Sequence, residues 1–470
     1  MSSEPREKPV GALELAAFAA PAAPLLALTL PTVMFLPPYF IEHIGLEEGV
    51  VGMLFFAARL FDLVLDPTLG ALQDRTQTRW GRRRVWLAAA TPFLMAAIWF
   101  VFIGLAPGAG PIQAGASIFV MYFIFAAMMV AHLGWSGELI PTYRGRTRTL
   151  GAVQTASLVG QTLMLVMAAA AAKGAGCIPG TVSQSDTGAN TVAVYAMGMA
   201  LLIMLPLTVM VACLFVREPQ TPPQPHMGLR AAIGTVFSNP VARRVLLPDF
   251  LLGVAQGVSG GLFLFYFQYV LGFVCEAQTL AAIYFVAGLV GVPIWWMLAQ
   301  RVGKHRALQV AFLYTALTTA LLLVTQPGQF GFAAGLMVLA GLAQGGCVLL
   351  TRSLMGDVVD EDEVRTGSRR SGLYYGLLLM TSKTGLAAGP LALVALQAVG
   401  FAASRGAGNS AEALGALSAM FVGIPVVLCV AGALSLRNYP LDEKRQAELH
   451  AAIEARHAAN SANTLGPSTK

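Results

Sequence analysis

The segment TVAVYAMGMALLIMLPLTVMVACLFV, residues 191–216, contains no charged side chain. A helix of this length is about 39 Å long, at about 1.5 Å per residue, and the hydrocarbon core of a bilayer is about 30 Å thick. Similar runs recur along the chain, in which 56% of the 470 residues are hydrophobic and 11% are charged, with a mean hydropathy of +0.67. This composition does not suit a water-facing surface, so the sequence predicts an integral membrane protein.

Twelve apolar runs are long enough to cross a membrane. Strands of a membrane barrel would show short alternating segments instead, and lipid leaves only helices and closed barrels as spanning structures. We therefore expect an all-α fold of twelve transmembrane helices. The predicted spans are residues 13–40, 48–72, 85–106, 114–140, 150–173, 191–216, 245–271, 278–300, 307–326, 330–354, 372–399 and 412–436.

Basic residues collect in alternate connections between these spans, as positively charged cytoplasmic loops do. The intervening connections carry almost none beyond Lys173 and Arg405. We expect both termini on the cytoplasmic side of a bacterial inner (plasma) membrane. The polar start, residues 1–10, lacks the pattern of a cleaved signal peptide, so the first run is expected to stay in the protein. The basic connections lie within residues 75–84, 144–148, 217–244, 301–306 and 365–370.

The net charge of +6 and the pI of about 9.1 do not indicate a nucleic-acid-binding protein. Basic charge confined to one set of short loops is what membrane topology alone produces. We therefore expect a lipid bilayer around the chain and no nucleic-acid partner.

The five cysteines show no paired metal-ligand spacing, so no metal site is expected from them. Cys213, Cys347 and Cys429 fall inside spans, where small buried side chains are expected. Cys177 and Cys275 fall in loops placed outside, and the sequence leaves open whether they form a disulfide.

The longest polar break, Arg217 to Arg244, contains a proline-rich stretch and divides the spans six and six. We interpret residues 217–244 as a cytoplasmic linker between an N-terminal six-helix bundle, residues 1–216, and a C-terminal one, residues 245–437. The remaining residues, 438–470, are predicted to be a cytoplasmic tail, with a solvated helix over residues 441–457.

The two halves share a weak internal repeat. The connection between spans two and three and the one between spans eight and nine each carry a glycine and a basic cluster. They resemble the loop signature of the major facilitator superfamily. An aspartate held near helix ends and guanidinium groups can form a charge lock that stabilises one conformation, and it can equally be a well-capped turn. The first loop contributes Asp74, Arg75, Arg82 and Arg83 as gating candidates.

Residues 59–84, RLFDLVLDPTLGALQDRTQTRWGRRR, closely resemble the glycoside–pentoside–hexuronide:cation symporter family, of which the melibiose carrier is a member. Residues 360–373, DEDEVRTGSRRSGL, resemble its second signature. The resemblance implies a major facilitator fold with a solute cavity between two six-helix bundles. It also implies symport of a small organic solute, a sugar or glycoside, driven by Na⁺ or H⁺. No other cofactor is implied.

Charged residues inside span two point to the same activity, because ionisable groups at membrane depth are costly and usually mark a pathway. Arg59, Asp62 and Asp66 are spaced i, i+3 and i+7 and share one helix face. Two such carboxylates can ligate a small cation or share a proton, and an internal pair with Arg59 is the structural alternative. The resemblance assigns both aspartates to the cation site and places Lys383 of span eleven beside it.

Three departures from the melibiose carrier concern the solute. The first span has no carboxylate, Met129 stands where the fourth helix has an acid, and Gln154 stands where the fifth has an arginine. Fewer groups for sugar hydroxyls make a less polar or amphipathic solute, of lysolipid type, the alternative. Fewer hard oxygens for a metal ion favour H⁺ slightly over Na⁺.

Polar and aromatic residues within the spans are the candidates for solute contact. Each can instead serve in helix packing. These substrate-binding candidates are His132, Trp135, Gln154, Gln256, Tyr266 and Tyr375. Glu138 at the inner end of span four, with Arg369 and Arg370 in the second signature, completes the gating set.

Other classes of function are weighed against symport. A membrane-embedded enzyme is not expected, because the chain has no nucleophile elbow, His-rich cluster or metal-ligand spacing. A receptor or assembly factor on a transporter fold stays open. No nucleotide-binding loop is present, so an ion gradient or the solute's own gradient must drive transport. We expect a monomer.

Overall fold

The computed structural model describes residues 11–76, 78–139, 143–174, 187–218, 234, 236–366, 370–441, 445–446, 448–449 and 452. All regular structure within these residues is helical. Eleven helical segments are long and apolar enough to cross a membrane. Helix α4 (Glu48–Arg75) is a twelfth crossing of 28 residues, less apolar because it contains Arg59, Asp62 and Asp66. The predicted twelve-helix all-α fold is confirmed.

The helices of the two halves follow one another in order. The first half comprises α1 (Ala12–Ala19), α2 (Ala22–Ala27), η1 (Pro31–Phe35), α3 (Leu36–Glu42), α4, α5 (Arg84–Trp99), η2 (Phe100–Gly104), α6 (Pro111–Leu139), α7 (Tyr143–Gly174) and α8 (Thr187–Phe215). The second comprises α10 (Pro240–Phe265), η4 (Tyr266–Val270), α11 (Ala277–Val302), α12 (Lys304–Ala320), η5 (Leu321–Val324), α13 (Phe330–Thr366), α14 (Ser371–Leu386), α15 (Ala388–Ala398), η6 (Ala403–Gly408), α16 (Ala411–Ser418), η7 (Ala419–Gly423) and α17 (Ile424–Ser435).

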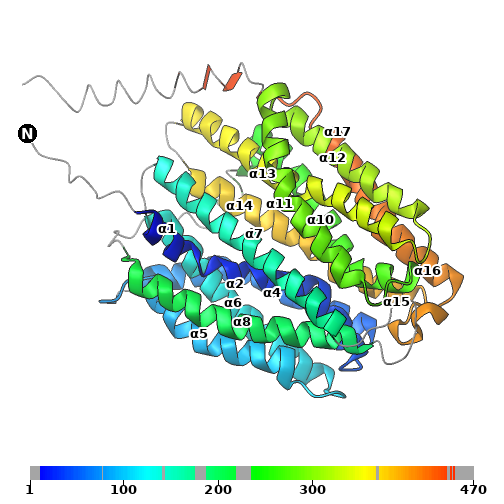
Figure 1. The fold of residues 1–470 in the computed structure, drawn as a ribbon. Helices are drawn as coiled ribbons and strands as arrows, with labels where there is room; N and C mark the ends of the chain where they lie inside the picture. Colours follow the sequence, from blue (N-terminus) through cyan, green and yellow to red (C-terminus); the bar gives the residue numbers. More distant parts are fainter. Residues whose placement is uncertain are drawn as a thin grey trace, which may run out of the picture.

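The twelve crossings form two six-helix bundles. Figure 1 shows α1 to α8 (blue to green) in one half of the molecule and α10 to α17 (green to red) in the other. Within the second half α11 packs on α13 and α10 packs on α14 and α17, and within the first half α2 packs on α7 and α4 on α6. The halves meet where α4 contacts α15 and where α7 contacts α11.

The first span, predicted over 13–40, is one crossing, Ala12–Glu42, but its helix is interrupted. Proline removes a backbone donor and clashes with the preceding turn. Pro21 caps α2 and Pro31 begins η1, so these two prolines lie at boundaries between α1, α2, η1 and α3. The carbonyl of Leu26 accepts from the Thr29 hydroxyl at 2.6 Å and from the Gln161 amide of α7 at 3.2 Å. Such side-chain bonds replace the lost helical ones, as a broken helix in lipid requires.

Two boundaries differ from those predicted. Helix α10 begins at Pro240 rather than 245, because the Asn239 side chain caps it by accepting from the backbone amides of Val241 and Ala242. Helix α13 continues to Thr366 rather than ending at 354. The acidic signature was predicted to lie in a loop, but its residues 360–363 lie on this helix, with Asp362 fully buried.

At the ends predicted to face outward, the halves are joined by three glutamates. Glu42 of α3 accepts a hydrogen bond from Tyr269 of the second half at 2.9 Å. The carboxylate of Glu47 accepts from Gln397 at 3.3 Å, and that of Glu48 accepts from the amide of Ala403 at 2.6 Å. These three contacts close the halves against each other at this end of the molecule.

Gly52 of α4 permits this closure. A Cβ atom there would come within 2.6 Å of the Pro390 carbonyl oxygen and 2.8 Å of the Val394 side chain. Only glycine allows α4 to approach α15 so closely.

The predicted solvated tail packs in part. Leu441 and Leu449 are 6% and 3% exposed and belong to the core of the second half. These two side chains are therefore covered rather than solvated.

Candidate cation and solute site between the halves

Lys383 of α14 joins the two halves by binding both aspartates of α4. Its ammonium nitrogen lies 3.0 Å from Asp62 Oδ2 and 2.5 Å from Asp66 Oδ2. The Asp62 side chain is 2% exposed, whereas the side chains of Asp66 and Lys383 are 31% and 29% exposed. One end of the cluster is therefore sealed in protein, and the other borders accessible space.

Each aspartate keeps one oxygen free. Asp62 Oδ1 and Asp66 Oδ1 are buried and have no hydrogen-bond partner among the described residues. Two carboxylates and one ammonium give the cluster a net charge of −1. A buried charge without a partner is costly, so one monovalent cation or one proton would neutralise the cluster.

Arg59 does not serve as the partner of these aspartates. Its guanidinium carbon lies 5.4 Å from the ring centre of Tyr122 on α6, a cation–π contact within the first half. Its Nη2 has no described hydrogen-bond partner. The structural alternative, an internal pair between Arg59 and an aspartate, is absent from the described residues.

Sequence reasoning missed a third membrane-embedded acid, Asp249 of α10. It is 7% exposed, and its Oδ2 accepts from the hydroxyls of Thr381 at 2.8 Å and Ser382 at 2.7 Å. Three consecutive residues of α14 thus contact acids on two helices, because Lys383 binds those of α4. An aspartate inside an apolar run was the available signal.

Arg352 of α13 was also missed. Its guanidinium donates a hydrogen bond across the halves to Oε1 of Gln154 on α7. The Tyr375 hydroxyl donates to the Arg352 carbonyl at 3.1 Å. Arg352 is exposed within its span, so it faces accessible space. The structure thereby brings together Gln154 and Tyr375, two of the predicted solute contacts.

Three predicted solute contacts are instead packed inside the bundles. His132 stacks on Phe18 with ring centres 4.9 Å apart, and its Nε2 lies 2.9 Å from the Phe18 carbonyl. Trp135 is fully buried against the same phenylalanine. Tyr266 stacks on Phe421 at 4.3 Å and is 2% exposed. These positions do not support solute contact in this conformation, because packing leaves the three side chains almost no open surface.

Gln256 of α10 is better placed. It is partly exposed, and no described residue accepts or donates a hydrogen bond at its side chain. It lies seven residues after Asp249, which puts both on one face of α10. Its role as a solute contact stays a prediction.

The described contacts of the gating candidates stay within one half. Arg83 donates to Gln73 at 3.2 Å. Glu218 accepts from the backbone amides of Arg82, Arg83 and Arg84 at the start of α5, an acidic cap on a helix N-terminus. Arg370 binds Asp362 with two hydrogen bonds, at 2.9 and 2.8 Å. Arg75 is exposed.

The remaining gating candidates fall where the structure gives no side-chain description. Arg369 lies outside the described residues, and so do the side chains of Asp74 and Glu138. Gating by this set stays a prediction.

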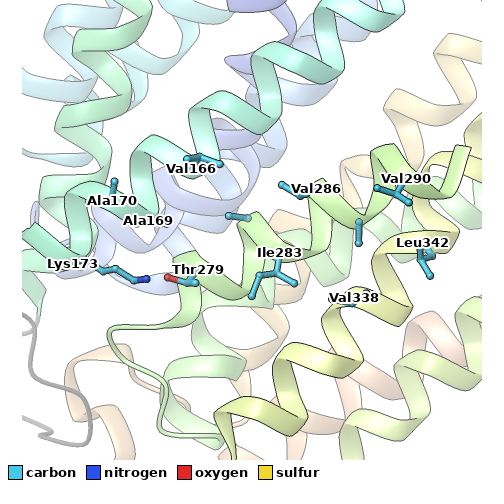
Figure 2. Close-up of a pocket in the computed structure, with 12 residues that line it drawn as sticks. Val166, Ala169, Ala170, Lys173, Thr279, Ile283, Val286, Val290, Val338 and Leu342 are labelled. Carbon is cyan, nitrogen blue, oxygen red and sulfur yellow. The ribbon is translucent and has the colours of Figure 1, made fainter.

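A separate apolar groove lies where the halves meet. It has a volume of about 600 Å³ and is lined by aliphatic side chains of α7, α11 and α13. Figure 2 shows the Lys173 ammonium pointing toward the Thr279 hydroxyl at one end. That hydroxyl is buried without a described hydrogen-bond partner. The groove suits an alkyl chain with a polar head.

The cysteines within the spans are free, whereas the described loop cysteine is oxidised. Cys213, Cys347 and Cys429 are free, and Cys275 is disulfide-bonded. Cys177, the partner considered from the sequence, lies outside the described residues. Among those residues no cluster of three or more metal-ligating side chains occurs.

Two six-helix bundles joined by a membrane-embedded ion pair define a transporter of the major facilitator type. The fold matches the crystal structure of the nucleoside transporter NupG with a TM-score of 0.62, at 16% identity, over 91% of this chain and 100% of that one. The chain belongs to the MFS/sugar transport protein family, whose sequence profile matches residues 17–443.

Curated relatives span nearly the whole chain. The inner membrane symporter YicJ of Escherichia coli is 24% identical over 413 residues, 85% of each chain. The putative glycoside/cation symporter YagG of the same organism is 24% identical over 418 residues, 88% of each chain. The sodium-dependent lysophosphatidylcholine symporter 1-A of Danio rerio is 23% identical over 450 residues, covering 88% of this chain and 82% of that protein.

Proposed function

We propose that this protein is a secondary active transporter that couples the movement of one monovalent cation, H⁺ or Na⁺, to symport of a small organic solute. The observation that carries the proposal is the cluster of Asp62, Asp66 and Lys383, with a net charge of −1 and one unbound oxygen on each aspartate. The family and fold are those of transporters rather than enzymes.

The position of the cluster explains how cation binding would act on conformation. Lys383 belongs to the second half and both aspartates to the first, so their ion pairs hold the halves together. A proton or Na⁺ on the aspartate oxygens weakens the attraction for Lys383. The cation therefore binds the two arrangements of the halves with different affinity, which is what a ligand needs in order to shift a conformational equilibrium.

A glycoside is the solute class that relatives support, since YagG is described as a putative glycoside/cation symporter. The accessible polar groups at the interface, Gln154, Gln256 and Tyr375, are suited to hydroxyl groups. Carriage of an amphipathic solute is the second candidate. The apolar groove headed by Lys173 and Thr279 favours it, and a lysophosphatidylcholine symporter is among the relatives.

We further propose a bacterial inner membrane location with both ends of the chain cytoplasmic, and function as a monomer. Alternate basic loops support the orientation, and the name of the relative YicJ supports the membrane. Accessibility of a cysteine introduced at Arg306 only from the outside of intact cells would contradict this orientation.

Transport by the purified protein in proteoliposomes tests the proposed function. We would supply radiolabelled isoprimeverose, melibiose and lysophosphatidylcholine under an inward Na⁺ gradient, an inward H⁺ gradient or neither. Accumulation of one solute above equilibrium under one gradient only is the expected result. Equal uptake with and without each gradient would establish a uniporter, and no uptake of any of them would favour the receptor alternative.

A further inference from the structure

Arg352 is an intramembrane cation that makes few polar contacts with the described residues. An arginine carries five N–H donors, and Gln154 is the one side chain among the described residues that accepts from it. No described carboxylate forms an ion pair with Arg352. Arginine in a membrane span normally pairs with an acid or a backbone carbonyl, because an unpaired charge there is expensive.

The nearby acid is already engaged elsewhere. Asp249 attracts Arg352 electrostatically, yet its Oδ2 is bound by the hydroxyls of Thr381 and Ser382. The charge of Asp249 thus stabilises Arg352 within the span, but Asp249 accepts no hydrogen bond from the guanidinium N–H groups. The accessible face of Arg352 remains available to a ligand.

A clasp between the halves is the simpler explanation of the Arg352–Gln154 contact. A clasp of opposite charges would place an acid opposite the arginine, as the cation site places Asp62 and Asp66 opposite Lys383. The residue opposite Arg352 in the other half is a neutral amide instead, which holds the guanidinium in place without supplying a counter-charge.

We propose that Arg352 anchors an anionic oxygen group, a carboxylate or a phosphate, of the transported solute. Guanidinium binds such groups through two parallel hydrogen bonds. The proposal rests on the proposed function, because it names the chemical class of solute for the same inter-half space. A sugar acid and a lysolipid headgroup both offer this chemistry.

The arrangement also links the anchor to the cation site. Lys383 binds the aspartates of α4. Thr381 and Ser382, the two residues before it, bind Asp249, whose negative charge attracts Arg352. A shift of α14 when a cation releases Lys383 would therefore also disturb the hydrogen bonds that Thr381 and Ser382 donate to Asp249 of α10, so cation binding and anion binding would influence each other.

Matched pairs of compounds test the anchor directly. We would measure binding to the nanodisc-embedded protein of 4-nitrophenyl β-glucuronide against the β-glucoside, and of oleoyl lysophosphatidic acid against monooleoylglycerol. Within each pair the compounds differ essentially in the anionic group. The anionic member of at least one pair should bind roughly 10- to 100-fold more tightly, the factor of a charge-assisted hydrogen bond. Preference within the first pair alone identifies a sugar acid, and within the second alone a lysolipid.

Arg352→Gln should abolish this preference and Arg352→Lys should keep part of it, whereas Arg437→Gln, at an exposed arginine of the inner end, should leave it intact. Gln397→Leu separates anchor from clasp, since it removes an inter-half hydrogen bond, to Glu47, outside the proposed site and should preserve the preference for the anion. If Arg352→Gln fails to fold, the comparison within each pair in the natural protein, together with Arg352→Lys, still tests the anchor.

Three results would overturn the anchor: equal binding within both pairs, no binding of either anion, or a preference that survives Arg352→Gln. The dependence of binding on Na⁺ and pH is read in the same titrations. An anion preference without any cation dependence would refute symport and leave the anchor standing. Cation-dependent binding of the neutral members would refute the anchor and leave symport standing.

Discussion

Replacing Asp62 with asparagine changes the net charge of the cation cluster from −1 to 0 while preserving side-chain volume. Lys383 keeps Asp66 as a partner at 2.5 Å, so no isolated charge is left in the span and the protein should still fold. What disappears is the reason for a cation to bind. Asp62→Asn should therefore uncouple the carrier without unfolding it.

The size of the effect follows from the geometry. Unit charges at the 3.0 Å separation seen between Lys383 and Asp62 attract by about 5 kcal/mol at an effective dielectric constant of about 20. Desolvation of the cation offsets much of this, and coupling between two ligands of one protein is typically about 1–3 kcal/mol. A saturating cation should thus raise solute affinity about 5- to 150-fold in the natural protein and leave it unchanged in the variant.

Cation binding can be measured without knowledge of the solute. The assays are binding of ²²Na⁺ to the purified protein and proton uptake followed with a pH dye. The natural protein should bind one monovalent cation or proton per chain, and Asp62→Asn none. Solute exchange between compartments of equal ion composition should persist in the variant. Glu412→Gln, the same loss of one carboxylate at an exposed outer position, is the control. Unaltered cation binding, or full gradient-driven accumulation, by well-folded Asp62→Asn would refute the reasoning and show that Asp62 is structural.

Three further predictions follow from the described contacts. Lys383→Met leaves the cation cluster with a net charge of −2, so its affinity for ²²Na⁺ or a proton should rise and a second monovalent ion should bind. A cation affinity no higher than that of the natural protein would contradict the charge count. Gly52→Val should force α4 away from α15 and open the end predicted to face outward, so an external reagent should label a cysteine placed at Gln256 more strongly. Gly335→Val, where a Cβ meets no atom within 4 Å, is the control. Equal labelling of the two variants would count against a role of the α4–α15 contact in closing this end. Trp135→Ala should cost about 3–5 kcal/mol of stability, seen as a lower thermal midpoint. Gln256→Ala should keep the midpoint and weaken solute binding. Weaker solute binding with an unchanged midpoint in Trp135→Ala would instead support Trp135 as a solute contact.

The twelve crossings could be read from the sequence because lipid permits few alternatives. Each crossing must be a long apolar helix, so run length alone fixes the number and approximate bounds of the helices. Boundaries failed where local chemistry was overlooked. The cap at Asn239 starts α10 early, and the prolines of the first span break a run that hydropathy shows as continuous. Buried pairing of Asp362 with Arg370 extends α13 through residues that look like a polar loop.

The sequence by itself determined the fold class and singled out Asp62, Asp66 and Lys383, because charged residues are rare and expensive within apolar runs. Only the tertiary structure decided which charges meet. Lys383 and Asp66 are 317 residues apart, and Arg352 and Gln154 are 198 apart, so their contact depends on how two bundles pack rather than on any local pattern. The same packing turned His132 and Trp135 toward Phe18 and left Arg352 facing open space. Helical periodicity places residues on a face, but the neighbour of that face is set by the assembled bundle.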